Sequence, residues 1–442
     1  MDIPTYNIIK GFYKDNTDTN KRQLIYRYFR ENMVVENIRA FGEVHTAPCL
    51  VDDMLDTLQL EFWSKKQTVY DSCCGKAAFQ LAIIEKLYQG MTHLEPKERI
   101  TFIINECIFI NDFQHLNVEI SIQLMELHSK YLVPELDIST LKFNFTIGDA
   151  LTQEHGKKYD LVVANPPYNT PNCLGHGGYP IYCKFIKIGI DLAKPNGYIL
   201  YVNPPAWRSA LLPNSRLKGL FEKMTHENQM VSLRMNDSKT GTKMFGCNVK
   251  YDYYLIKRTP CHTITKITDY EGKIFNLDLS KHSFIPNFAL DDVMNLIAKD
   301  DEPRLKMMYG RSVYDVKKKH MSPVPSDEFR YKCLHTTPKR GNRFYYSNVD
   351  KGHFGVPKVI FGRCGVYDAI VDYEGKLGLT NEAYAIIIES QEQGEMIKKA
   401  LLSDKFKRIL KANLFSNFGI NYTVFTMYRA DFYKIVNSDI EK

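Results

Sequence analysis

The sequence contains no long apolar run and no recognisable export signal. No stretch of its 442 residues approaches the roughly 20 consecutive apolar residues that a membrane-spanning helix requires. A signal peptide combines a basic start with an apolar stretch of about 7 to 15 residues, and the N-terminus lacks this combination. We therefore expect a cytoplasmic protein that has no membrane partner.

Cysteine pairs with the spacing of a zinc site are also lacking. The ten cysteines are scattered, and none forms the CxxC pair from which a tetrahedral zinc site usually draws its ligands. We expect reduced thiols and no metal.

The net charge of +7 is mild. Hydrophobic residues make up 44% and charged residues 25% of the sequence, which is the balance of a folded globular protein rather than of a disordered one.

The sequence contains no internal repeat and no low-complexity tract, so we expect ordinary globular domains. The chain is too long for a single hydrophobic core and fits two or more domains of about 100 to 250 residues each. Residues 1–40 have the pattern of an amphipathic helical arm. Over residues 41–260, apolar strand-like runs alternate with helical segments, which predicts an α/β domain with a parallel sheet covered by helices on both faces. The alternation stops there, and residues 261–442 are predicted to form a mixed α+β domain.

Candidate binding residues follow three successive strand-like runs. Ligands of parallel sheets bind at the carboxyl ends of the strands. A turn that holds Gly75 follows the first run and opens a helix, so its backbone can approach a ligand closely. Asp112 and Asp149 follow the next two runs. By analogy with dinucleotide-binding sheets, Asp112 is placed to accept a hydrogen bond from a ribose hydroxyl and Asp149 from an adenine amino group.

The fourth strand-like run ends in Asn165, Pro166, Pro167 and Tyr168. The prolines stiffen the loop, so the Asn165 side-chain oxygen and the Pro166 carbonyl can both point at one amino group. Tyr168 offers a flat face on which a base can stack. This motif predicts a site that holds an exocyclic NH2 group and aims its lone pair at an electrophilic methyl group.

A second Asn-Pro-Pro, from Asn203 to Pro205, ends the fifth strand-like run. It continues with Ala206 and Trp207 and therefore lacks the aromatic platform directly after the prolines. We assign the chemistry to the first motif. Asn203 is expected to be a turn residue, with a contact to nucleic acid as the alternative.

Several motifs, in the same order, resemble the gamma-type N6-adenine DNA methyltransferases of restriction-modification systems. The resemblance covers about residues 38–258. FGEVHTAPCLVDDML resembles the family's G-x-V-x-T-P-P segment, DSCCGKAAF resembles D-P-A-C-G-S-G-A-F, and ANPPY matches the catalytic motif in full. The resemblance implies a Rossmann-like S-adenosylmethionine methyltransferase sheet, followed by a C-terminal target-recognition domain.

The resemblance also implies roles for individual residues, with S-adenosylmethionine as the cofactor. The residues implied to bind the cofactor are Thr46, Asp71, Gly75, Asp112 and Asp149, and Gly42 also matches the first motif. The catalytic residues would be Asn165, Pro166, Pro167 and Tyr168. Tyr168 and Phe245 would stack on the two faces of the target base, with Tyr251 as the weaker candidate for the second face.

The cofactor loop departs from the family pattern at two important positions. Lys76 stands where the family has serine, and Ala77 stands where it has glycine. A methyl group at the glycine position would crowd the cofactor or force the turn to differ. These departures put the affinity for the cofactor in doubt more than the identity of the domain.

The resemblance implies a site-specific enzyme that transfers a methyl group to N6 of an adenine flipped out of duplex DNA. The C-terminal domain would read the target. Basic residues near aromatic residues can neutralise phosphates and stack on bases, and the candidate DNA contacts are Lys339, Arg340, Arg343 and Arg363. Double-stranded DNA is thus the expected partner, a separate restriction endonuclease is compatible with it, and the setting would be a bacterium, a phage or a large virus.

Two alternatives remain open at the level of sequence. Asn-Pro-Pro-Tyr also occurs in methyltransferases of RNA bases or of protein glutamine amides, because an amide NH2 group fits the same two acceptors. The altered cofactor loop is compatible with a catalytically inactive, methyltransferase-like DNA-binding protein, although the intact catalytic motif argues against it.

Overall fold

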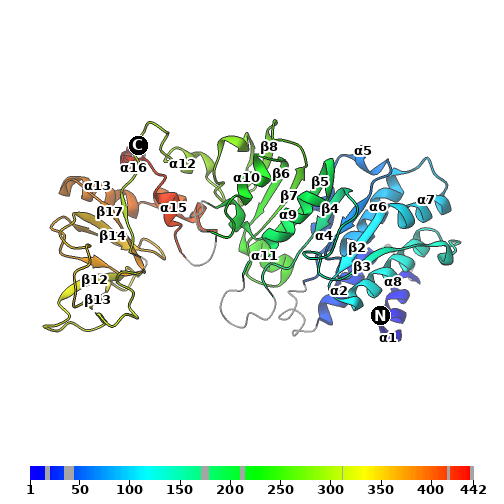
Figure 1. Cartoon of the computed structure of the whole chain (residues 1–442), viewed down its shortest axis with the longest axis horizontal. Coiled ribbons are helices and arrows are strands. Elements are labelled where there is room, and N and C mark those ends of the chain that lie inside the picture. Colours follow the sequence, from blue (N-terminus) through cyan, green and yellow to red (C-terminus); the bar gives the residue numbers. More distant parts are fainter. Residues whose placement is uncertain are drawn as a thin grey trace. The chain divides into compact units, whose positions relative to one another are not determined.

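The computed structural model describes residues 1–14, 20–33, 44–170, 179–209, 215–310, 312–415 and 419–438. The chain divides into two compact units (Figure 1). Unit 1 comprises Met1–Trp207 and Leu217–Ser283, and unit 2 comprises Arg208–Arg216 and Phe284–Lys442. The division after Ser283 differs from the expected boundary at residue 260, because two further strands extend the first sheet.

Unit 1 is built on one nine-stranded sheet with the order β3-β2-β1-β4-β5-β7-β6-β8-β9. Strands β1 to β5 are parallel, whereas β7 runs antiparallel to both of its neighbours. The strands are β1 (Val69–Asp71), β2 (Ile108–Asp112), β3 (Asn144–Ile147), β4 (Tyr159–Ala164), β5 (Ala193–Asn203), β6 (Gln229–Asn236), β7 (Tyr251–Lys257), β8 (Thr265–Thr268) and β9 (Ile274–Leu277). The chain moves outward from β1 to β3 and then returns to β4, so the topological switch point lies between β1 and β4.

Helices cover both faces of this sheet, as predicted. The central strands are apolar on both faces, which a sheet buried between two helical layers requires. Leu161 and Val163 of β4 and Leu200 of β5 join one core with the helices α4, α6 and α8, while α9 contacts β4 and β5. The helices after α2 are α4 (Pro48–Leu55), α5 (Leu60–Trp63), α6 (Ala78–Gly90), α7 (Pro96–Phe102), α8 (His115–Leu132), α9 (Tyr182–Leu192), α10 (Leu220–Thr225) and α11 (Ser238–Phe245).

The two N-terminal helices belong to unit 1. Helices α1 (Ile3–Lys14) and α2 (Lys21–Glu31) lie within the segment expected to form an arm. Helix α1 contacts α8, and α2 contacts α4 and α6. The Arg22 guanidinium donates to both carboxylate oxygens of Asp52, at 2.9 and 3.0 Å, and lies 2.9 Å from the Glu85 carboxylate. Two carboxylates on the neighbouring helices α4 and α6 therefore hold α2 in place.

Unit 2 is a mixed α+β domain, as predicted. It contains two four-stranded sheets, ordered β10-β17-β14-β15 and β11-β13-β12-β16. The strands are β10 (Met307–Met308), β11 (Met321–Ser322), β12 (Tyr331–Thr336), β13 (Arg343–Ser347), β14 (Lys358–Gly362), β15 (Ala369–Asp372), β16 (Gly378–Leu379) and β17 (Ala383–Ile387), and the helices are α12 (Leu290–Met294), α13 (Gln391–Leu402), α14 (Asp404–Ala412), α15 (Tyr422–Phe425) and α16 (Phe432–Ser438).

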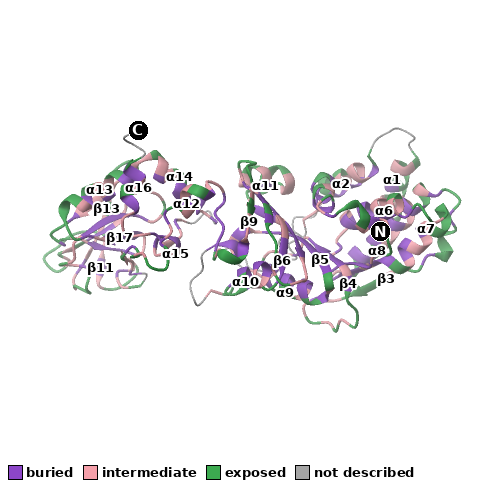
Figure 2. Ribbon diagram, turned by 90° about the horizontal axis from the view of Figure 1, so that it is seen from above, coloured by how far each residue is buried: buried purple, intermediate pink, exposed green. Residues whose placement is uncertain are grey.

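The central strands of both units, such as β4 and β14, are buried, whereas β3 and β9 at the edges of the first sheet are largely exposed (Figure 2). In unit 2, all five residues of β14 are buried, and α13, α14 and α16 pack into the same core. The Lys358 ammonium is fully buried and donates to Asp372 Oδ2 at 2.9 Å and to the carbonyls of His353 and Val356. Within the described ranges, no helix is both long enough and apolar enough to cross a membrane.

The Arg22 contacts predict that a single substitution loosens α2. Replacing Arg22 by Met removes a bidentate ion pair whose arginine side chain is only 10% exposed. We expect the free energy of unfolding to fall by about 2 to 4 kcal/mol, because two carboxylates lose a partly buried partner. Urea denaturation followed by circular dichroism measures the change, and Arg27→Met, an exposed arginine on the same helix, is the matched control. Equal midpoints for the two variants would contradict the role of Arg22.

Candidate active site

The carboxyl ends of β1, β2 and β3 are tied together by hydrogen bonds. Backbone N–H groups of Cys74 and Gly148 donate to the carbonyls of Asn111 and Asp112, at 2.9 and 3.0 Å. The Asn111 side-chain amide donates to the carbonyls of Ser72 and Gly148, both at 3.1 Å. These bonds bring the loops that carry Asp71, Gly75, Asp112 and Asp149 to one edge of the sheet, as the sequence predicted. Asn111 was missed, although a polar residue inside the apolar run ECIFIND was its signal.

Asp112 holds the loop after β1 through its carboxylate. One oxygen accepts from the Gly75 backbone N–H at 2.9 Å, and the other accepts from the Gln114 N–H at 2.8 Å and the Asn117 amide at 3.2 Å. Asp112 is 7% exposed. Asp112, which is expected to bind the ribose, thus also fixes the position of the Gly75 turn. Its carboxylate accepts hydrogen bonds both from the loop after β1 and from the start of the α8 segment.

The next acid, Asp149, lies at the end of the β3 segment and is half-buried. Its carboxylate accepts from the Leu151 N–H at 2.9 Å. Phe113, directly after Asp112, is 65% exposed even though it is a large aromatic residue. A flat apolar face directly after Asp112 suits a purine ring. Sequence reasoning missed Phe113, and its signal was an aromatic residue directly after a strand-end acid.

Asp71 is the most buried acid of the candidate site. It is 2% exposed, and its two oxygens accept from the Cys73 N–H and from the Gln80 amide, both at 2.9 Å. Burial raises the pKa of this carboxyl to about 7, although the two hydrogen bonds oppose the shift. Asp71 is therefore poised to change its charge when a cation comes close.

Ala77 keeps the conformation that a glycine would adopt. Its φ is +59°, in the left-handed region, where an alanine costs roughly 1 to 2 kcal/mol. The side chain is fully buried and belongs to the core formed with α4, α6 and α8. The turn therefore keeps the left-handed backbone conformation that suits a glycine, and the methyl group of Ala77 is packed in the core of unit 1.

The Asn-Pro-Pro-Tyr motif begins directly after β4. The Asn165 side-chain N–H donates to Thr46 Oγ1 at 3.1 Å, so two residues that lie 119 positions apart meet here. The Tyr168 hydroxyl is buried without a hydrogen-bond partner, whereas the residue as a whole is partly exposed. Burial is the main reason why the pKa of Tyr168 is raised. The hydroxyl thus points into the protein, while the residue as a whole keeps some exposed surface.

Phe245, at the end of α11, is a better candidate for the second stacking face than Tyr251. Phe245 is partly exposed, whereas Tyr251 is 1% exposed and lies in the core. Their ring centroids are 5.0 Å apart in a T-shaped contact.

Of the first family-like motif, the structure describes Thr46 and Pro48, whereas Gly42 lies outside the described residues.

The second Asn-Pro-Pro has a structural role. Asn203 is the last residue of β5, is fully buried, and accepts from the Tyr254 hydroxyl at 2.8 Å. Trp207, four residues later, is also fully buried. Asn203 is therefore a strand residue and not the turn residue that the sequence suggested.

The four candidate DNA contacts lie in two parts of unit 2 that the fold brings together: Lys339 and Arg340 follow β12, Arg343 begins β13, and Arg363 follows β14. The Gly362 N–H donates to Thr337 Oγ1 at 3.1 Å, which joins the loop after β12 to the loop after β14. Lys339, Arg340 and Arg343 are exposed. Arg363 is half-buried, and its guanidinium lies 3.5 Å from the Glu382 carboxylate.

An aromatic residue completes this loop cluster of unit 2. The Lys339 ammonium lies 5.5 Å from the ring centroid of Tyr367, which is 56% exposed. The Asn342 amide donates to Asp368 at 2.7 Å and fixes the two loops further. Sequence reasoning missed Tyr367, whose signal was an aromatic residue in the segment FGRCGVYD. The exposed surface therefore combines cations with an aromatic face.

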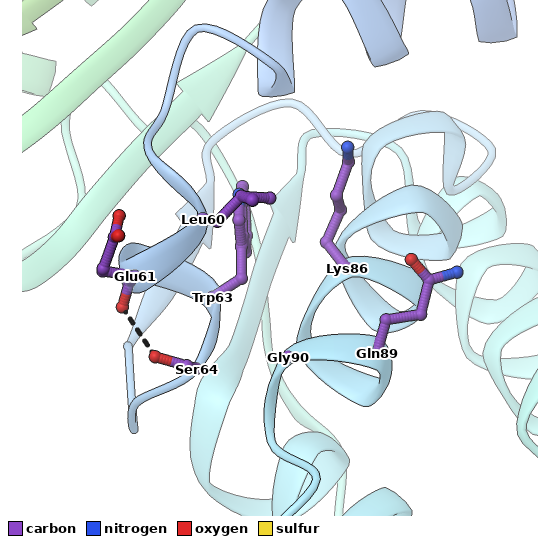
Figure 3. Close-up of a pocket in the computed structure, with 7 residues that line it drawn as sticks. All are labelled: Leu60, Glu61, Trp63, Ser64, Lys86, Gln89 and Gly90. Atoms are coloured by element: carbon purple, nitrogen blue, oxygen red, sulfur yellow. Dashed lines mark hydrogen bonds between the residues drawn. The ribbon is translucent and has the colours of Figure 1, made fainter.

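A surface pocket between α5 and α6 is separate from the candidate active site (Figure 3). It is lined by residues that include Leu60, Trp63, Lys86 and Gly90. Gly90 ends α6, whereas the cofactor loop opens it, and 13 helical residues span about 20 Å. None of the candidate site residues lines this pocket.

Comparisons with known proteins match the region of the chain that carries this candidate site. Residues 55–239 match the model of a family described as Eco57I restriction-modification methylase. The match contains the cofactor loop, the three strand-end acids and the Asn-Pro-Pro-Tyr motif. It supports the resemblance to restriction-modification methyltransferases that the sequence motifs indicate, and with it S-adenosylmethionine as the cofactor. No curated protein matches the chain in sequence.

Solved structures share the fold at low sequence identity. The DrdV–DNA complex is 12% identical, with a TM-score of 0.53 over 95% of this chain and 59% of that chain. The type IIL enzyme MmeI in complex with DNA is 12% identical, with a TM-score of 0.51 over 92% of this chain and 69% of that chain. A type I modification subunit from Vibrio vulnificus YJ016 is 14% identical, with a TM-score of 0.41 over 57% and 52%. The chain thus spans about half to two thirds of the length of these proteins.

The raised pKa of Asp71 predicts that cofactor binding depends on pH. The ammonium group of S-adenosylmethionine, when it lies near Asp71, would stabilise the ionised Asp71 carboxylate. Binding of the cofactor to protein whose Asp71 is protonated must therefore release a proton. The affinity for S-adenosylmethionine should therefore fall about fivefold from pH 7 to pH 6 and become constant about one pH unit above 7. Isothermal titration in buffers with different ionisation enthalpies measures both the affinity and the released proton.

Asp71→Asn provides the control for this pH dependence. The variant should bind more weakly and should lose the pH dependence, because an amide does not titrate in this range. If the variant keeps the dependence, a titratable group other than Asp71 causes it.

Proposed function

We propose that this chain is a site-specific DNA methyltransferase that transfers a methyl group from S-adenosylmethionine to the exocyclic N6 of an adenine flipped out of duplex DNA. The observation that carries the proposal is the position of Asn165. It follows β4 at the switch point of the sheet, beside the loop and the acids that would bind the cofactor. In an open α/β sheet, this crevice is where a ligand binds.

Asn165 is oriented to accept a hydrogen bond from the target. Its side-chain N–H donates to Thr46, so its Oδ1 atom is the part of the amide that is available for the amino group of a base. The Pro166 carbonyl would accept the second hydrogen of that amino group. With both hydrogens held, the nitrogen lone pair is directed at the methyl group that S-adenosylmethionine supplies. Positioning and polarisation then provide most of the rate enhancement, and the proton leaves to water.

The target adenine would lie between Tyr168 and Phe245. Flipping a base costs a few kcal/mol, which stacking on the exposed ring and contacts to phosphates offset. The partial exposure of Tyr168 is compatible with this role, and its hydroxyl is buried in the protein. Phe245 ends a helix whose Met244 carbonyl accepts from the Tyr26 hydroxyl at 3.3 Å.

The cofactor would bind along the edge formed by the first three strands. Asp112 would accept from the ribose hydroxyls, and Asp149 from the adenine amino group. Gly75 brings backbone close to the cofactor, and the open space around its Cα is consistent with this role. Asp71 and Thr46 would complete the cofactor site from the other side of the loop.

Unit 2 would read the DNA sequence. The exposed cations Lys339, Arg340 and Arg343 would neutralise phosphates or contact base edges, and Tyr367 would add a stacking face. The pairing of Arg363 with Glu382 makes it a weaker candidate for a direct contact. Two DNA complexes that share the fold, those of the type IIL restriction-modification enzyme MmeI and of DrdV, support DNA as the partner, and a separate restriction endonuclease remains compatible with it.

The decisive experiment measures methylated nucleosides. The purified protein is incubated with unmethylated duplex DNA and S-adenosylmethionine, and the digested DNA is analysed by mass spectrometry. We expect N6-methyladenine with the wild type and a loss of at least about a hundredfold in rate with Asn165→Ala, because the amino group loses its side-chain acceptor. Asn276→Ala, an exposed asparagine on β9, should leave the rate unchanged.

The other outcomes separate the alternatives. Methylation of RNA or of a protein glutamine, but not of DNA, would show that the methyl acceptor is RNA or protein instead of DNA. Cofactor binding without methylation of DNA, RNA or protein would support an inactive DNA-binding module. Equal methylation of every adenine would contradict the sequence-reading role of unit 2.

The exposed cations of unit 2 predict a change in the salt dependence of DNA binding. Arg340→Gln should reduce the slope of log affinity against log salt by about 1, because one phosphate contact is lost. Fluorescence anisotropy at several salt concentrations measures the slope. Lys434→Gln, which replaces a lysine of α16 in the same unit, is the control, and an unchanged slope for Arg340→Gln would remove this residue from the interface.

A further inference from the structure

The C-terminal half of helix α2 lies against the end of helix α11, which carries Phe245. The Tyr26 hydroxyl of α2 donates to the Met244 carbonyl at 3.3 Å, although 218 residues separate the two. A Cβ atom on Gly246, directly after Phe245, would lie 3.5 Å from Nη2 of Arg30. Arg30, in the last turn of α2, is therefore close to the ring proposed to stack on the target base. Helix α2 precedes the residues that the methylase family model matches.

The Arg30 guanidinium is fixed on one side and open on the other. Its Nη1 atom donates to the Tyr26 hydroxyl at 2.9 Å, and its central carbon lies 5.7 Å from the Tyr26 ring centroid. The residue is exposed, and no carboxylate in the part of the chain that the structure describes forms an ion pair with it. Arg22 of the same helix differs, because Asp52 and Glu85 neutralise it. A guanidinium has five N–H donors, of which Tyr26 takes one, so Arg30 can bind an anion.

Helix α11 adds positive charge before Phe245. Lys239 and Lys243 are exposed and lie one turn apart on the same side of this helix. Glu31 is the only acid in the sequences of α2 and α11. Both helices that meet here therefore present exposed cations, and such a surface favours a polyanionic ligand.

A flipped nucleotide keeps its phosphates next to the protein surface that binds its base. The base is rotated out about its backbone, and the phosphates on either side stay joined to it through a single sugar. A phosphate of the target nucleotide must therefore lie close to the ring that stacks on the base. A guanidinium binds phosphate oxygens through two parallel N–H donors, which makes the contact stronger and more directional than that of an ammonium.

We propose that Arg30 binds a DNA phosphate next to the flipped adenine, and that α2 is therefore part of the DNA-binding surface of unit 1. The inference rests on the proposed function and deepens it, because it names the backbone group that the protein holds while the base lies in the site. Tyr26 is a positioning residue, since its hydroxyl accepts from Arg30 and donates to the Met244 carbonyl. One tyrosine thus links the guanidinium that binds the phosphate to the helix that carries Phe245.

The test neutralises one phosphate at a time. It uses a duplex with the target sequence that the methylation experiment identifies, in which a methylphosphonate replaces one of the two phosphates that flank the target adenine. Fluorescence anisotropy measures binding in the presence of S-adenosylhomocysteine, which has no methyl group to transfer. The wild type should lose about tenfold in affinity with the methylphosphonate at one of these positions. Arg30→Gln should bind the unmodified duplex about tenfold more weakly and lose less than about twofold more with that methylphosphonate, because the contact is already absent.

Controls separate a phosphate contact from a general loss of structure. Lys10→Gln removes an exposed cation that lies 5.7 Å from the ring centroid of Tyr6, four residues earlier on α1, and should behave like the wild type with every duplex. Arg30→Lys, which keeps the charge but not the planar fork, should recover part of the lost affinity. Isothermal titration should give the same affinity for S-adenosylmethionine with the wild type and with Arg30→Gln.

Three results would overturn the assignment of Arg30 alone, in a wild-type protein that methylates adenine. They are an unchanged affinity of Arg30→Gln for the unmodified duplex, a methylphosphonate effect as large in Arg30→Gln as in the wild type, and no methylphosphonate effect on the wild type at either position. Wild-type protein that methylates no adenine in DNA would overturn the proposed function, and this inference with it.

Discussion

The hydrogen bond from the Gly75 N–H to the Asp112 carboxylate is the contact on which the candidate site depends. It joins the loop after β1 to the end of β2, while the other oxygen of the same carboxylate accepts from the start of the α8 segment. One carboxylate thereby sets the distance between a strand end, a glycine turn and a helix. A parallel sheet offers such edges repeatedly, but only tied loops keep a cofactor, a catalytic amide and a target base in one geometry.

Much of this arrangement could be predicted because the relevant residues follow strands. Strand-helix alternation and the rule that parallel strands carry ligands at their carboxyl ends are local properties of the sequence. They were enough to bring Asp112, Asp149 and Asn165 to one edge of the sheet. The meeting of Asn165 with Thr46 followed only from a family resemblance, because 119 residues separate the two. Local sequence patterns also did not predict how far the sheet extends, because β8 joins the sheet by pairing with β6, which is not adjacent to it in sequence.

The departures in the cofactor loop show why substitutions need their structural surroundings. Ala77 occupies a left-handed position at an energetic cost, but its methyl group packs in the core of unit 1. Lys76 replaces a small residue, yet an aromatic ring from α2 supports its charge. Both partners come from elements distant in sequence, and neither could be deduced from the loop itself. A motif that departs from its family is therefore not evidence of lost activity until its neighbours are known.

The chain leaves unit 1 after Trp207 and enters unit 2 at Arg208, so neighbouring residues belong to different units. Arg208 is fully buried, donating to the Ile285 carbonyl at 2.9 Å and to Asn287 at 2.8 Å. This insertion limits how the gene can recombine. A crossover after Ser283 would bring in a foreign second unit without matched acceptors for Arg208, and an uncompensated buried charge costs about 3 to 5 kcal/mol. An intact second unit would be inherited only by exchanging both of its segments, Arg208–Arg216 and Phe284–Lys442.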